Sequence, residues 1–203
     1  VLASILANGH ILLEDYPGLA KTLIARLFSQ ALELRFSRIQ FTPDLLPSDI
    51  TGSSIYDQRS HDFTFRAGPI FTNLLLADEI NRTPPKTQAA LMEAMEERQV
   101  TSVGKRYPLP DPFFVLATQN PIEQEGTYPL PEAQLDRFMF QIQIRYPNVD
   151  QELEIVRRSS HKAEVQILPV LDQVGIARVQ SLVRQTPVAD HVIKYALRLV
   201  RAT

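Results

Sequence analysis

The stretch from His10 to Leu34 reads HILLEDYPGLAKTLIARLFSQALEL, and it decides how the rest of the chain is interpreted. It opens with a continuous apolar run, which is typical of a strand buried on both faces. A turn over 15–20 follows, and from Lys21 onward the apolar side chains recur at helical spacing. A strand, a turn and a helix in that order predict one unit of an α/β fold, with the turn at the carboxyl end of the strand.

The turn is similar to a phosphate-binding loop. The usual signature is Gly, four variable residues and then Gly-Lys-Ser/Thr, placed between a strand and a helix. The free N–H groups at the start of the helix suit phosphate oxygens. We predict that this loop binds the phosphates of ATP, with Lys21 neutralising β/γ-phosphate charge and Thr22 ligating Mg²⁺. The alternative is a plain strand–turn–helix with an exposed lysine. The eight predicted binding residues are Asp15, Tyr16, Pro17, Gly18, Leu19, Ala20, Lys21 and Thr22.

The loop departs from the signature because Asp15 and Ala20 stand where glycine is expected. If φ at Ala20 is negative, its methyl group points away from phosphate, and Ala20→Gly changes affinity little. If that φ is positive, alanine is strained by ~1 kcal/mol or more. We expect that the two replacements do not disable the loop.

A second strand end carries two adjacent carboxylates. Four apolar residues run directly into Asp78 and Glu79. An aspartate at a strand tip can hold the Mg²⁺ shell, and the next glutamate can polarise the attacking water. The alternative is an acidic turn, which is common. Because two strand tips of a parallel sheet converge on one crevice, we predict Asp78 as a metal ligand and Glu79 as a catalytic residue.

Two further polar residues stand at element boundaries. A strand over 113–117 runs into Thr118-Gln119-Asn120, where the amide of Asn120 could orient the water or sense the γ-phosphate. The alternative is a turn before Pro121. Arg137 lies between a short helix and a strand, and from the residues alone an ion pair with Asp136 or Glu132 is the preferred interpretation.

The remaining pattern predicts an α/β P-loop fold with a parallel sheet covered on both faces, an αβα core over residues 1–146. A change of composition at 146–148 leads into helices only, which predicts the start of a helical subdomain over 147–203. The other expected elements are strands at 38–41, 73–78 and 138–144, a helix from Pro84 to about Arg98, a hairpin over 100–107, a hairpin arm at 63–65, and helices at 21–34, 150–160, 172–185 and 188–202.

Composition narrows the class of protein. The chain has 203 residues, a formal net charge of −2 and no cysteine, which excludes disulfides and cysteine-ligated metals. The mild acidity disfavours a nucleic-acid partner. No apolar run approaches the ~18 residues that span a bilayer, and no signal peptide is evident, so we expect a cytoplasmic protein without a membrane span. The abrupt start and end suggest a piece of a longer protein.

Several long runs remain to be explained: FTPDLLPSDITG (41–52), GPIF (68–71), ADEINR (77–82), PPKTQ (84–88), ATQNP (117–121) and EGTYPLPEAQLDRF (125–138). Together, these runs resemble the MoxR family of AAA+ ATPases. The resemblance implies an αβα core with an all-helical lid, a hairpin insert within 44–71, and assembly into a hexameric ring. It implies that Asn120 senses the γ-phosphate and that Arg137 is an arginine finger reaching a neighbour's ATP.

Family resemblance also suggests what the protein acts on. Members are chaperone-like remodelers of protein clients, often with a von Willebrand factor A partner, in enzyme maturation or metal-cofactor insertion. The leading hypothesis is therefore an Mg-dependent ATPase that remodels protein partners. A nucleotide-binding scaffold without turnover and, less favoured, a DNA translocase are the alternatives. The sensor 2 arginine expected later in the lid lies beyond this chain.

Overall fold

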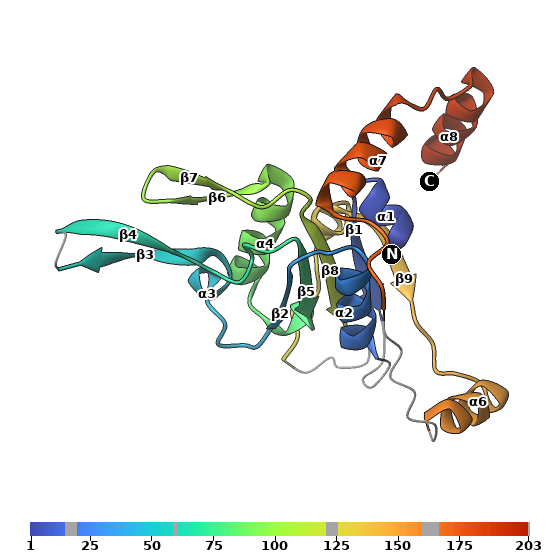
Figure 1. Ribbon diagram of the computed structural model, residues 1–203, viewed down its shortest axis with the longest axis horizontal. Helices are drawn as coiled ribbons and strands as arrows, with labels where there is room; N and C mark the ends of the chain where they lie inside the picture. The colour runs from blue at the N-terminus through green and yellow to red at the C-terminus, as the bar shows by residue number, and fades with distance from the viewer. Residues whose placement is uncertain (15–19, 59–60, 121–125, 160–166, 203) are drawn as a thin grey trace.

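A parallel sheet of five strands forms the centre of the computed structural model, which describes residues 1–14, 20–58, 61–120, 126–159 and 167–202 (Figure 1). The spatial order is β2-β5-β8-β1-β9, and every neighbouring pair is parallel. This confirms the predicted α/β class and the predicted strands to within two residues. The strands are β1 (His10–Glu14), β2 (Phe36–Gln40), β5 (Leu74–Asp78), β8 (Phe114–Gln119) and β9 (Phe138–Gln143).

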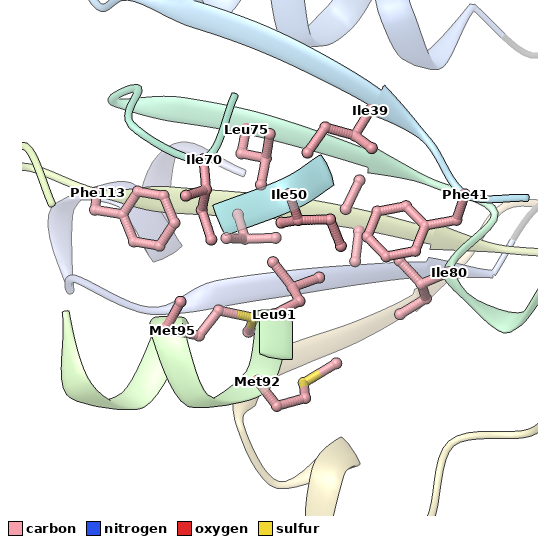
Figure 2. Packing of buried hydrophobic residues seen from close by; sticks show 14 of the residues in the cluster. Ile39, Phe41, Ile50, Ile70, Leu75, Ile80, Leu91, Met92, Met95 and Phe113 are labelled. Carbon is pink, nitrogen blue, oxygen red and sulfur yellow. The ribbon is translucent and has the colours of Figure 1, made fainter. Parts of the chain in front are cut away.

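Helices cover both faces of the sheet, because the central strands bury alternate side chains in opposite directions. On one face, α3 (Pro47–Thr51) and α4 (Pro85–Glu97) pack over a core that Figure 2 shows from close by. That core includes Leu12, Ile39, Phe41, Ile50, Ile70, Leu75, Ile80, Leu91 and Phe113. On the other face lie α1 (Leu2–Leu6), α2 (Lys21–Ala31) and α7 (Gln173–Gln185), which bury Ile5, Ile11, Ala25, Leu74, Leu76, Leu116 and Ile176. Each fully buried Leu or Ile side chain contributes roughly 1.5–3 kcal/mol, so this double burial holds the strands in place.

The helix that follows the phosphate loop is shorter than predicted. It was expected to reach Leu34, but α2 ends at Ala31. Glu33 takes a left-handed backbone conformation with φ of 47°, which cannot continue a right-handed helix. The turn brings Leu32 and Leu34 into the core, where both are buried. The stabilisation from burying Leu32 and Leu34 therefore outweighs the stabilisation that another turn of helix would give.

Two β-hairpins project together from the same side of the sheet (Figure 1). One pairs β3 (Gly52–Asp57) with β4 (Asp62–Ala67), and the other pairs β6 (Gln99–Ser102) with β7 (Lys105–Pro108). They touch through the rings of Phe65 and Tyr107, stacked with centroids 3.9 Å apart, and through the hydroxyls of Ser54 and Ser102, 3.1 Å apart. The second hairpin confirms the prediction over 100–107, and the first lies inside the insert expected within 44–71.

After Tyr146 the regular elements in the described ranges are all helical, as expected: α6 (Val149–Ser159), α7 and α8 (Asp190–Ala202). α7 joins the core through Ile176 and through Gln180, whose amide donates to the Ile5 carbonyl over 2.7 Å. α8 has no buried residue. The short α5 (Glu132–Leu135) precedes β9, and a 3-10 turn, η1 (Ile80–Arg82), follows β5. Within the described ranges, no helix is both long enough and apolar enough to cross a bilayer.

Candidate functional site

Lys21 and Asp78 meet at the carboxyl edge of the sheet. Lys21 is the first residue of α2, and Asp78 is the last residue of β5. The Lys21 Nζ lies 3.6 Å from Asp78 Oδ1, and the two side chains are only 12% and 8% exposed. The structure thus brings the start of the helix and the acidic strand tip together, as the convergence of parallel strands predicted.

Asp78 is surrounded by donors from three elements. The Thr118 hydroxyl donates to Oδ1 over 2.6 Å, and the Arg38 guanidinium donates to Oδ2 over 2.7 Å through Nη2 and 3.2 Å through Nε. Burial acts to raise the pKa of Asp78, but these hydrogen bonds and the charges of Lys21 and Arg38 outweigh it, so the pKa lies below its usual value. The carboxylate is therefore ionised at neutral pH.

Glu79 leaves the strand in an unusual direction. Its backbone is left-handed, with φ of 58° and ψ of 50°, and its N–H donates to the Thr118 hydroxyl over 2.9 Å. The carboxylate accepts from Gln40 Nε2 over 2.8 Å and pairs with Arg82 Nε at 3.1 Å. The side chain of Glu79 is 22% exposed, so it has some access to solvent.

Asn120 follows β8 directly and is buried. Its main-chain carbonyl accepts from the Asn81 side chain over 3.2 Å, which fixes the strand end beside the η1 turn. The third strand tip therefore lies next to the acidic pair.

The phosphate loop is described only in part. Asp15 to Leu19 lie outside the described residues, whereas Ala20 is the N-cap of α2 and Thr22 lies in its first turn. Ala20 has φ of 57° and ψ of 24°. Of the two conditions stated for this position, the positive φ that strains an alanine is therefore the one that holds. The left-handed conformation places the first N–H groups of the helix, and glycine would adopt it without the clash of a Cβ.

We expect Ala20→Gly to raise the free energy of unfolding by about 1 kcal/mol, because glycine relieves the left-handed strain. Ala177→Gly is the matched control: Ala177 is exposed within α7, and glycine there should lower the free energy by about 1 kcal/mol. Urea unfolding of both variants measures the difference. A loss of stability in Ala20→Gly equal to that of the control would contradict the strain.

Arg137 lies at the opposite edge of the sheet. It precedes β9, whose parallel neighbour β1 also starts at this edge, whereas Lys21 lies beside Asp78 at the carboxyl ends of the strands. Its Nη1 donates to the Ala133 carbonyl over 2.5 Å, and its Nη2 pairs with Glu96 on α4. The ion pair expected with Asp136 or Glu132 is thus made with Glu96 instead. A pocket of about 570 Å³ adjoins Arg137 and is also lined by His10, Glu96 and Arg98. A five-residue strand spans roughly 16 Å, so Arg137 is not brought to Lys21 of its own chain.

Three residues around the acidic pair were not singled out from the sequence: Arg38, Gln40 and Thr118. Arg38 Nη2 also donates to Gln40 Oε1 over 2.8 Å, so the two join Asp78 to Glu79 through side chains. The signal for Arg38 and Gln40 was the alternation Arg38-Ile39-Gln40 in an expected strand, where only Ile39 is buried. Thr118 was named only as part of the polar strand end before Asn120. Two polar residues on one face of a strand that ends beside an acid could have indicated contact with it.

The fold and the site define the class: this is an α/β P-loop protein of the AAA+ type. The sequence profile of the ATPase family associated with various cellular activities (AAA) matches residues 10–140. Chaperone MoxR1 of Mycobacterium tuberculosis is 47% identical over the whole chain, and YeaC of Bacillus subtilis, described as uncharacterized, is 50% identical. The chain belongs to the MoxR family of AAA+ ATPases.

A solved structure agrees with this fold. The crystal structure of a provisionally named ATPase from Cytophaga hutchinsonii matches with a TM-score of 0.87 and 48% identity, over 99% of this chain and 61% of that one. The chain spans 63% of YeaC and 54% of MoxR1. It therefore corresponds to between about half and two thirds of these three proteins.

Proposed function

We propose that this chain binds Mg-ATP at the carboxyl edge of its sheet and hydrolyses the γ-phosphate. The observation that carries the proposal is the convergence of Lys21, Asp78 and Glu79, with Asn120 beside them. Lys21 supplies positive charge to the phosphates, together with the backbone of residues 15–20 and the start of α2. Asn120 contacts the γ-phosphate, and the Arg38 pair keeps Asp78 ionised.

The donors present fit a magnesium ion. Mg²⁺ is usually held by one or two protein oxygens together with substrate phosphates and waters, not by a complete protein cage. Asp78 supplies an ionised carboxylate and Thr22 a hydroxyl, and no group of three or more His, Asp or Glu gathers among the described residues. When bound, Mg²⁺ would neutralise charge on the phosphate oxygens.

Glu79 acts as the residue that polarises the attacking water. Its carboxylate now accepts from Gln40 and Arg82, so it must exchange one of these hydrogen bonds for one from water. The water oxygen then forms the new bond to phosphorus as the bond to ADP breaks, and Glu79 receives the proton or orients its transfer.

The wider role is proposed from the architecture and the relatives. Residues 1–146 form the nucleotide-binding core, and 147–203 form the start of a helical lid, since only helices follow β9 in the described ranges. Arg137, at the opposite edge, serves a neighbour's nucleotide in a hexameric ring. The name of Chaperone MoxR1 supports the remodelling of protein clients. We place the ring in the cytoplasm, and the family resemblance suggests a von Willebrand factor A protein as its partner.

A nucleotide-binding scaffold without turnover is the second candidate. The observation that favours it is the engagement of Glu79 by Gln40 and Arg82, because a carboxylate occupied by these two partners has less capacity to accept from a water. Phosphate release measured against protein concentration distinguishes the two. A rate per subunit that rises with concentration supports a shared active site with turnover, whereas bound ATP that is never hydrolysed supports the scaffold.

Lys21→Ala tests the site itself. We expect ATP affinity to fall by ~100-fold or more, because a charge-assisted contact to phosphate is lost. The fold should persist, because Arg38 and Thr118 still satisfy Asp78. Lys105→Ala, an exposed lysine in the β6–β7 hairpin, is the control and should bind ATP normally. Calorimetry measures both affinities. Equal ATP affinity for Lys21→Ala and the parent chain would contradict the role of Lys21 in phosphate binding.

A further inference from the structure

One buried hydroxyl joins the two acidic residues of the proposed site. Thr118 is fully buried in β8, and its Oγ1 lies 2.6 Å from Asp78 Oδ1 and 2.9 Å from the Glu79 nitrogen. The backbone N–H of Glu79 can only donate, so the hydroxyl accepts from it. The ionised Asp78 can only accept, so the hydroxyl proton points to it. Its neighbours thus determine that the Thr118 hydroxyl accepts one hydrogen bond, from Glu79, and donates the other, to Asp78.

The two hydrogen bonds of Thr118 hold different parts of the site, the Asp78 carboxylate and the Glu79 backbone. The bond to Asp78 sets the rotation of the carboxylate, whose other oxygen is held by Arg38. The bond from Glu79 stabilises its left-handed backbone, a conformation that disfavours any side chain with a Cβ. That conformation sets the direction in which the Glu79 side chain leaves the strand. The same hydroxyl therefore orients both proposed functional carboxylates.

Thr118 also lies two residues before Asn120, which directly follows the end of β8. The Asn81 side chain fixes the Asn120 carbonyl next to η1. We propose that Thr118 is a positioning residue for ATP hydrolysis, whose hydroxyl aligns Asp78 and Glu79 with β8, the strand that precedes Asn120. The inference rests on the proposed function and names a residue that acts through others.

Thr118→Val tests this inference, because valine keeps the shape of threonine and replaces the hydroxyl with a methyl group. We expect kcat to fall by ~10–100-fold, as for other residues that orient ligands, while the KM for ATP stays within about twofold. The Mg²⁺ concentration for half-maximal rate should rise, because Asp78 loses the bond that sets its rotation. Thr118→Ser restores the hydroxyl and should recover kcat to within about threefold.

Thr83→Val is the matched control. Thr83 is also fully buried, but its hydroxyl has no hydrogen-bond partner among the described residues. This variant should therefore keep the kcat and the Mg²⁺ dependence of the parent. Thermal unfolding of all variants shows whether they fold, and Thr118→Ala provides a second side chain without a hydroxyl if the valine variant does not.

The outcomes separate the inference from the proposed function. A parent that hydrolyses ATP and a folded Thr118→Val with unchanged kcat and Mg²⁺ dependence would overturn the positioning role alone. Loss of ATP binding in Thr118→Val as large as that in Lys21→Ala would overturn it as well, since the residue would then act in binding. A parent without ATP turnover overturns both proposals.

Discussion

Arg137→Ala is expected to bind ATP like the parent protein and to hydrolyse it ~10³–10⁵-fold more slowly, the range measured for arginine fingers. The reason is its place in the fold. Arg137 precedes β9 at the edge of the sheet opposite Lys21, so its guanidinium lies away from the proposed phosphate site of its own chain. A guanidinium delivered by a neighbour would stabilise charge on the transferring phosphoryl group.

Mixing two inactive variants distinguishes action in trans from a structural role. Arg137→Ala keeps an intact phosphate site, and Lys21→Ala keeps an intact finger, so a mixed interface can pair the two and recover part of the turnover. The experiment uses the full-length protein, because this chain spans 54–63% of the relatives named above. If mixed rings form and turnover never returns, Arg137 acts within its own chain or only in a structural role, and the shared-site mechanism fails.

Glu96 gives this experiment a second variant. In the isolated chain the Arg137 guanidinium is bound by Glu96 and by the Ala133 carbonyl. Glu96→Gln removes the charge of the partner and keeps its size, so it tests whether that pair matters for the finger. Arg106→Ala, an exposed arginine on β7, should leave turnover unchanged and is the control for loss of a surface charge.

Glu79→Gln is expected to retain bound ATP and to slow hydrolysis by ~10²–10⁴-fold, the usual contribution of a general base. Glutamine keeps the size of the side chain but cannot take a proton from water. Asp78→Asn should instead weaken Mg²⁺-dependent ATP binding, because it removes the negative charge of the carboxylate that Thr118 and Arg38 contact. Single-turnover hydrolysis and ATP titrations with and without Mg²⁺ separate the two effects.

Glu97→Gln, an exposed glutamate at the end of α4, is the matched control for the change of charge. It should affect neither binding nor turnover. Equal loss of ATP binding in Glu79→Gln and Asp78→Asn, with no influence of Mg²⁺, would show that the two carboxylates do not have separate roles.

The sequence was sufficient where burial determines the structure. Apolar runs such as Leu74 to Ala77 are compatible with few structures other than a strand covered on both faces, so the sheet and its carboxyl edge were predicted correctly. Local conformation was harder. The end of α2 depended on whether Leu32 and Leu34 could reach the core, and φ at Ala20 depended on how the loop meets the helix.

Contacts between elements were the least predictable part of the site. Arg38 and Thr118 reach Asp78 because β2 and β8 flank β5, an order that the sequence does not state. Arg137 pairs with Glu96, far away in the chain, rather than with its neighbours Asp136 or Glu132. Side-chain partners of this kind follow from strand order and helix placement, not from spacing along the chain.

The stacked rings of Phe65 and Tyr107 have a mechanical consequence. They join the two projecting hairpins side to side. Bending one hairpin would therefore strain the other, so the joined pair should be stiffer than either hairpin alone. Both are rooted at α4: β6 continues from its end, and α3, which precedes β3, packs against it, with the Thr87 hydroxyl donating to the Leu45 carbonyl over 2.8 Å. A tilt of α4 would therefore move both hairpins together. A force applied to either hairpin would be transmitted through α4 to η1, the turn that follows Glu79.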